Sequence, residues 1–324
     1  MAKQRNQYFD FLRGIAIVMV VGIHTFYIPE YSSFPILYVI GRELLNFAVP
    51  LFLVISGIYT MRSYRRDGNY LRYLKRQIPK VYIPTIIWSL PSYALALYSG
   101  KDIIVSTWNL FCCGFSIFYF IALIIQMYCL LPVYQLTIDK YGGVIISGVI
   151  TAISVLIHTY LLPSNLPLVV SVGPCIYWLI FFAIGVYYSD KPSDYSLLLP
   201  VFLIIIGCIS QIFEYKMLVE MGRGGIGIKL TSWIYSTGVV LLLISDKVKK
   251  GYKENIITGI IRTLGVNSFG IYLVHILVLI PINKLSSNYW IENWILAIIC
   301  SMALITISKR IFPTLSIKYL GFTQ

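Results

Sequence analysis

The chain consists mostly of long apolar runs, and short stretches between them hold most of its charged and turn residues. A helix needs roughly 20 apolar residues to cross the hydrocarbon core of a bilayer. The core holds no water to bond the backbone, so only helices or closed barrels span it. The runs therefore predict about ten transmembrane helices. We expect the spans at 8–28, 43–61, 81–98, 115–136, 143–161, 173–189, 196–213, 229–245, 264–283 and 292–311.

The composition agrees with a protein whose main solvent is lipid. Hydrophobic residues make up 58% of the chain and charged residues only 12%, whereas soluble domains carry about 25% charge. The run at 8–28 is too long for a signal-peptide core and lacks a cleavage site, so it is expected to be a retained helix. We predict an all-α fold, a polytopic integral membrane helical bundle, in which residues 1–324 form one transmembrane domain.

The positive charge indicates orientation in the membrane. With the N-terminus in the cytoplasm, most Lys and Arg residues fall in cytoplasmic segments, as the positive-inside rule requires. An even number of spans then places both termini in the cytoplasm. The cytoplasmic Lys and Arg residues that set this orientation account for most of the net charge of +13, so nucleic-acid binding is not needed to explain it. We expect a multi-pass membrane protein. The six cysteines show no metal-ligand or disulfide spacing, so no metal site is expected.

The first span carries three ionisable residues, Asp10, Arg13 and His24. Such groups are costly in a bilayer and usually face a bundle interior or a wet cavity. Arg13 and His24 are about three helical turns apart, roughly 16 Å along the axis, and so lie on one stripe at different depths. Asp10 precedes Arg13 by one turn and can pair with it, which fixes the direction of the guanidinium. Taken singly, Arg13 fits a snorkelling cation and His24 a hydrogen-bonded helix residue; together they indicate function.

Four ordered motifs run along almost the whole chain. The first span reads DFLRGIA at 10–16 and is followed by His24. The second span reads VPLFLVISG at 49–57. A basic run leads to Pro84, and a late helix reads SFGIYLVH at 268–275. Together these motifs resemble those of acyltransferase family 3, a family of membrane-bound enzymes, with Leu53 in place of the family's second Phe. The resemblance is to the form without an appended soluble hydrolase-like domain, and it implies a bacterial inner or plasma membrane.

One stretch departs from the family pattern. Many members carry a histidine in the sequence HLWFL as the fourth span begins, whereas this chain reads IFYFI at 117–121. The aromatic character persists and the histidine does not. The departure points to a different acceptor and leaves the first-helix pair unaffected.

The resemblance implies transfer of an acyl group, usually acetyl from acetyl-CoA, to a sugar hydroxyl of a lipid-linked or nascent surface glycan. Acyl-CoA is then a donor substrate, and no tightly bound cofactor is expected. The acceptor is a glycan such as an O-antigen, capsule or exopolysaccharide unit. Among the residues of the spans, His24 is the best suited to act as the base, since its unperturbed pKa is about 6.5. Arg13 would bind a CoA phosphate or stabilise charge at the thioester carbonyl, and Asp10 would orient it.

The remaining candidates are expected to bind substrate. Arg76 and Lys80 belong to a run of seven cations that can attract the phosphates of CoA or simply set topology against lipid. Tyr272 and His275 are expected to line the cavity, or to be packing residues. Ser56 is expected to contribute shape and a hydrogen bond, because Ser-Gly in a transmembrane helix permits close packing and no hydrolase turn surrounds it.

Other readings stay open at this point. Arg42 and Glu43, at the outer mouth of the second span, can contact a sugar, although a solvated salt bridge is the default. Intramembrane Arg and His also mark the paths of transporters, so a flippase for a glycan or small anion is the main alternative. A noncatalytic scaffold for envelope assembly is the third. The sequence is compatible with either an acetyl or a succinyl donor, and with any of these acceptor glycans.

Overall fold

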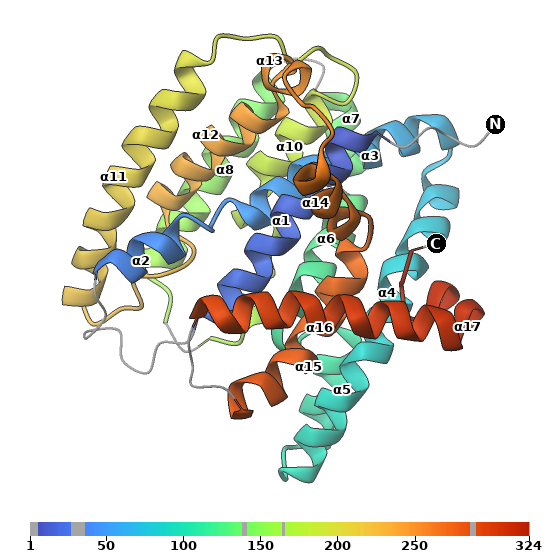
Figure 1. The fold of residues 1–324 in the computed structure, drawn as a ribbon. Coiled ribbons are helices and arrows are strands. Elements are labelled where there is room, and N and C mark those ends of the chain that lie inside the picture. Colours follow the sequence, from blue (N-terminus) through green and yellow to red (C-terminus); the bar gives the residue numbers. More distant parts are fainter. Residues whose placement is uncertain (1–5, 27–35, 138–140, 164–165, 286–289, 324) are drawn as a thin grey trace. The chain divides into compact units, whose positions relative to one another are not determined.

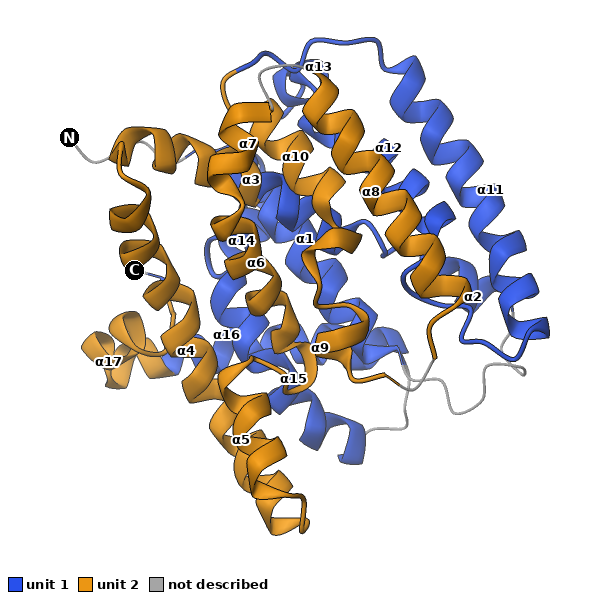
Figure 2. Ribbon diagram, turned by 180° about the vertical axis from the view of Figure 1, so that it is seen from behind, with its two compact units in different colours: residues 1–55, 191–307, 323 blue, residues 56–190, 308–322, 324 orange. Residues whose placement is uncertain are grey.

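All regular secondary structure in the described part of the chain is helical (Figure 1). The computed structural model describes residues 6–26, 36–137, 141–163, 166–285 and 290–323. The helices form two compact units (Figure 2). Unit 1 comprises residues 1–55, 191–307 and 323, and unit 2 comprises residues 56–190, 308–322 and 324. The predicted all-helical membrane class is confirmed.

Unit 1 contains the first helix and most of the C-terminal half of the chain, and within it α11 and α12 lie side by side (Figure 1). Its helices are α1 (Gln7–Thr25), α2 (Ile36–Glu43), the start of α3 (Ala48–Asp67), α11 (Leu198–Glu220), α12 (Leu230–Ile244), α13 (Asp246–Lys250), α14 (Ile256–Val266), α15 (Ser268–Leu285) and most of α16 (Trp290–Ile311).

Unit 2 contains the central part of the chain. Its helices are the rest of α3, α4 (Tyr70–Tyr98), α5 (Ile103–Phe111), η1 (Ser116–Phe118), α6 (Tyr119–Cys129), α7 (Leu131–Thr137), α8 (Tyr141–Tyr160), α9 (Leu168–Ser171), η2 (Cys175–Tyr177), α10 (Leu179–Tyr187) and α17 (Pro313–Lys318).

Every predicted span contains a helix of the structure, although not all are long enough to cross alone. Among the described residues, seven helices are long and apolar enough to span, or eight if the bent pair Ile103–Phe111 and Ser116–Cys129 is one span. The helices α10 and α12 have only 9 and 15 residues. The count of about ten spans, the cytoplasmic placement of both termini and the single domain over 1–324 stay predictions. The end of the span 8–28 lies outside the described residues.

Two segments differ from the predicted boundaries. The span 115–136 is divided into η1, α6 and α7, and the division before α7 falls beside Pro132, whose ring has no N–H to donate to a continuing helix. The basic connection after the second span is not a loop. Here α3 continues to Asp67, Gly68 turns the chain with a φ of +63°, and Asn69 caps α4 by accepting from the Arg72 N–H.

A helix that the hydropathy pattern did not predict, α14, packs along α1. The two run antiparallel with their backbones in contact, because Gly14 of α1 and Gly265 of α14 have no side chains. A Cβ on Gly14 would overlap the carbonyl oxygen of Ile261, and one on Gly265 would overlap that of Asp10. A capping box formed by Asn255 and Thr258 starts α14. This contact holds the end of α1 that carries the first candidate residues.

Replacement of Gly265 by alanine tests this contact. We expect Gly265→Ala to destabilise the protein by about 2 kcal/mol, because the added methyl group meets backbone that cannot rotate away. The measurement is the thermal unfolding midpoint of the purified protein, which should fall by several degrees. Gly259→Ala is the matched control on the same helix, since a Cβ there meets nothing within 4 Å. Equal midpoints for the two variants would contradict the close contact.

Candidate active site

The structure brings two predicted site residues together in unit 1. His24 lies in the last turn of α1, and His275 lies within α15. Their ring centroids are 5.4 Å apart, with an angle of 43° between the ring planes. His24 is half-buried and His275 is fully buried. The ring of Tyr272, also buried, lies 6.2 Å from that of His275. Two imidazoles therefore face each other among apolar helices.

The backbone of α15 fixes the tautomer of His275. Nδ1 lies 2.8 Å from the carbonyl oxygen of Tyr272 and 3.0 Å from that of Ile271. A carbonyl oxygen only accepts, so Nδ1 carries the proton and donates it. Nε2 then presents a lone pair, and it is buried without a hydrogen-bond partner among the described residues. A buried acceptor without a donor is rare in native proteins and marks a place for a ligand or water.

Two tryptophans of α16 hold the turn of α1 that carries His24. Trp290 Nε1 donates to the carbonyl oxygen of Gly22 at 2.9 Å, and Trp294 Nε1 donates to that of Val18 at 2.7 Å. Their rings stack with centroids 5.9 Å apart. A Cβ on Gly22 would lie 2.5 Å from the Trp294 ring. The contacts set the depth and rotation of His24.

The predicted pairing of Asp10 and Arg13 is confirmed. Arg13 Nη1 donates to Asp10 Oδ1 at 2.9 Å, and the carboxylate is 3% exposed whereas the guanidinium is 24% exposed. Both residues lie on α1, which is one uninterrupted helix as far as His24. The ion pair directs the guanidinium fork while leaving part of it accessible. The roles of the two residues in chemistry stay predictions.

The other predicted binding residues belong to unit 2. Arg76, on α4, pairs with Asp67 at 2.7 Å and donates to Ser63 Oγ at 2.9 Å. Lys80 is exposed one turn further along the same helix. Ser56 is half-buried on α3. Its neighbour Gly57 packs against α10, where a Cβ would lie 2.6 Å from a backbone oxygen, so close packing at the Ser-Gly step is confirmed.

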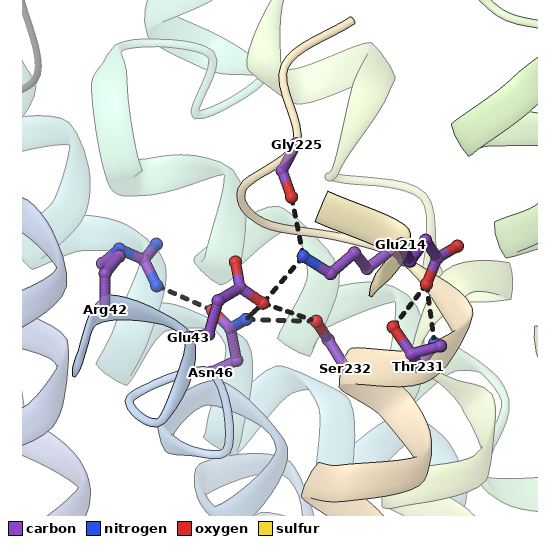
Figure 3. Close-up of polar contacts among 8 residues, drawn as sticks. Arg42, Glu43, Asn46, Glu214, Gly225, Thr231 and Ser232 are labelled. Carbon is purple, nitrogen blue, oxygen red and sulfur yellow. Dashed lines mark hydrogen bonds and ion pairs between the residues drawn. The ribbon is translucent and has the colours of Figure 1, made fainter. Parts of the chain in front are cut away.

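The expectation of a solvated salt bridge at Arg42 and Glu43 is wrong. Both are buried, and Glu43 pairs with Lys229 at 2.8 Å, with the two side chains 0% and 1% exposed (Figure 3). Sequence reasoning missed this partner because it is distant along the chain and falls at the end of another apolar run. The sequence did hold one indication, because Lys229 begins the predicted span 229–245 at the outer face, where Glu43 was also expected. We call Arg42, Glu43, Asn46, Lys229 and Ser232 the buried ion-pair cluster.

The chain is thus a polytopic helical membrane protein in which ionisable side chains are buried between the helices. The model of acyltransferase family 3, described as an acyltransferase domain, matches residues 6–309. The chain therefore belongs to this family, and it is a membrane acyltransferase. Comparison with curated proteins and with solved structures finds no match.

Replacement of Gly22 tests whether the position of His24 matters. We expect Gly22→Ala to lower acyl transfer by about tenfold or more, because the new methyl group displaces Trp294 or the His24 turn, and small misplacements of a reacting group are costly. Turnover is measured at equal membrane abundance. Gly142→Ala, at the start of α8, is the control, since a Cβ there meets nothing within 4 Å. Unchanged turnover in Gly22→Ala would show that this turn tolerates displacement.

Proposed function

We propose that the protein transfers an acyl group, acetyl in the first instance, from acyl-CoA to a hydroxyl of a surface or lipid-linked glycan, with His24 as the general base. The observation that carries this proposal is the pairing of His24 with His275, whose buried Nε2 is an unfilled acceptor. Family membership supports acyl transfer, and the motif resemblance supports the donor and acceptor classes.

The imidazole pair suits the activation of a hydroxyl. A hydroxyl is a weak nucleophile until a base takes its proton as it attacks. His275 Nε2 can only accept, so an N–H of His24 turned toward it would donate and leave the other nitrogen of His24 with its lone pair free for the acceptor. His275 is thus a positioning residue that selects the productive tautomer of His24. The backbone carbonyl of Tyr272 holds His275 in turn.

The transfer step balances with His24 as the only proton carrier. The acceptor oxygen forms a bond to the thioester carbonyl carbon while its proton moves to His24. The tetrahedral intermediate collapses, the C–S bond breaks, and the proton on His24 passes to the CoA sulfur. The ester and CoA-SH leave, and His24 returns neutral.

Cations are proposed to bind the donor. The Arg13 guanidinium, oriented by Asp10, presents donors in a fixed fork that suits a phosphate or a developing oxyanion. Arg76 and Lys80 offer exposed positive charge on α4, which suits the phosphates of CoA. We also assign Ser56 and Tyr272 to substrate binding. The proposed location is a bacterial inner or plasma membrane.

Replacement of His24 tests the proposed base. We expect His24→Ala to reduce acyl transfer by about 10²-fold to 10⁴-fold, because the hydroxyl loses its proton acceptor. Mass spectrometry of surface and lipid-linked glycans, from cells with wild type, variant or no protein, detects the acyl mass increment. His158→Ala removes the third histidine, on α8, and serves as the control. An increment retained in His24→Ala would remove this role. Changed glycan abundance or sidedness without any increment would favour transport or scaffolding.

Replacement of Arg76 tests the donor site. We expect Arg76→Ala to raise KM for acetyl-CoA by about tenfold at unchanged KM for the acceptor, since a hydrogen bond to a charged group contributes about 1.5 kcal/mol or more. Steady-state kinetics of acetyl-CoA consumption in nanodiscs provide the measurement. Arg72→Ala, an exposed cation on the same helix, should have a smaller effect. Equal changes in the two variants would indicate a general charge effect in place of a specific contact.

A further inference from the structure

One oxygen of the buried carboxylate of Glu43 collects all its hydrogen bonds. Oε2 lies 2.8 Å from Lys229 Nζ and accepts from Asn46 Nδ2 at 3.0 Å and from Ser232 Oγ at 3.2 Å (Figure 3). Lys229 also donates to the carbonyl oxygen of Gly225 at 2.6 Å. The charge of Glu43 is therefore balanced and its carboxylate plane is fixed from one side.

The other oxygen of Glu43 has no donor. Oε1 is buried and without a hydrogen-bond partner among the described residues. An unsatisfied buried acceptor costs about 1–3 kcal/mol, and more when the group is charged. Three donors gather on Oε2, so the protein does not lack donors here. The unfilled position therefore fits a group from outside the chain.

Arg42 is linked to the same carboxylate through Asn46. Its Nη1 donates to Asn46 Oδ1 at 2.7 Å, while the Nδ2 atom of Asn46 donates to Glu43 and Ser232. All the polar atoms of the Asn46 side chain are thus used, which leaves one orientation for its amide. Arg42 as a whole residue is 9% exposed.

The cluster lies beside the turn of α1 that carries His24. A Cβ on Gly41, the neighbour of Arg42, would lie 3.2 Å from the ring of Trp290, and Trp290 donates to the carbonyl of Gly22. The Arg42 guanidinium is also close enough to His24 to act on it electrostatically. The proposed base and the unfilled oxygen of Glu43 therefore belong to one region of unit 1.

The chemistry of the two groups selects the ligand. The Glu43 carboxylate can only accept, so its partner must donate, which excludes a phosphate or a carboxylate at this oxygen. An ammonium would donate but would face the Arg42 cation. A hydroxyl does both tasks, because it donates to Oε1 and accepts from the guanidinium.

We propose that Arg42 and Oε1 of Glu43 form a subsite for an uncharged, hydroxyl-bearing sugar of the acceptor, and this rests on the proposed glycan acyltransferase function. A hydroxyl bound there orients the sugar so that a second hydroxyl meets His24. Lys229, Asn46 and Ser232 are positioning residues, since they hold the carboxylate and the guanidinium without occupying Oε1.

The test measures sugar binding directly, apart from acyl transfer. Purified protein in nanodiscs is titrated with methyl glycosides of neutral hexoses and N-acetylhexosamines, and with methyl glucuronide as a charged probe, by saturation-transfer NMR. We expect a neutral glycoside to bind wild type and to lose at least tenfold in affinity in Arg42→Gln. The double variant Glu43→Gln/Lys229→Met should lose as much, and it removes both members of the ion pair, whereas Glu43→Gln alone leaves the Lys229 ammonium without its carboxylate.

Glu214→Gln is the matched control, because Glu214 is a second buried carboxylate that the Thr231 N–H and hydroxyl hold away from Glu43 (Figure 3). It should bind glycosides as wild type does, and all variants should keep the wild-type KM for acetyl-CoA. Absence of neutral glycoside binding to wild type, or equal binding by all variants, overturns the subsite. In either case, glycan mass increments that depend on His24 would leave the proposed function standing. Without such increments, the proposed function fails by itself.

Discussion

A polar group inside a bilayer must find its partner within the protein, and this constraint organises the whole of unit 1. No water is available to satisfy what the helices leave unpaired. Asp10 pairs with Arg13, Glu43 pairs with Lys229, and the indoles of α16 donate to carbonyl oxygens of α1. Glu43 Oε1 and His275 Nε2 are among the buried polar atoms of unit 1 that have no hydrogen-bond partner among the described residues, and both belong to the region of His24.

The helix α1 is fixed at two levels, and each candidate residue lies beside one of them. Near its start, the backbone contact of Gly14 with α14 holds the turn of Arg13. Near its end, Trp290 and Trp294 hold the turn of His24. Because α1 is uninterrupted between them, the spacing of the cation and the imidazole is set by helix geometry. Preorganisation of this kind lowers the cost of bringing reacting groups together.

The sequence predicted the features that depend on local pattern. Apolar runs located the helices, and a spacing of one turn predicted the Asp10 and Arg13 pair. The hydropathy pattern did not predict the helix α14, because this helix is short and amphipathic and contains no apolar run long enough to span a bilayer. The pairing of Glu43 with Lys229 was not predicted, because the two residues lie at the ends of apolar runs that are far apart in the sequence, and no local pattern relates them. The role of the tryptophans depends on which carbonyl oxygens they meet, which only the packing of α16 on α1 reveals.

The buried ion pair of Glu43 and Lys229 is better understood as a positioning device than as a source of stability. Two charges removed from water lose hydration that their attraction hardly restores, and a well-packed apolar pair of similar volume often stabilises a protein as much. The ion pair does something that an apolar pair cannot, since it fixes one carboxylate oxygen and leaves the other unoccupied. A flexible carboxylate would have to be ordered when a sugar binds, whereas this one is already ordered. The free-energy cost of burying and ordering the carboxylate therefore falls on folding and not on binding of the acceptor. A selective hydroxyl-binding site requires a carboxylate that is ordered in this way.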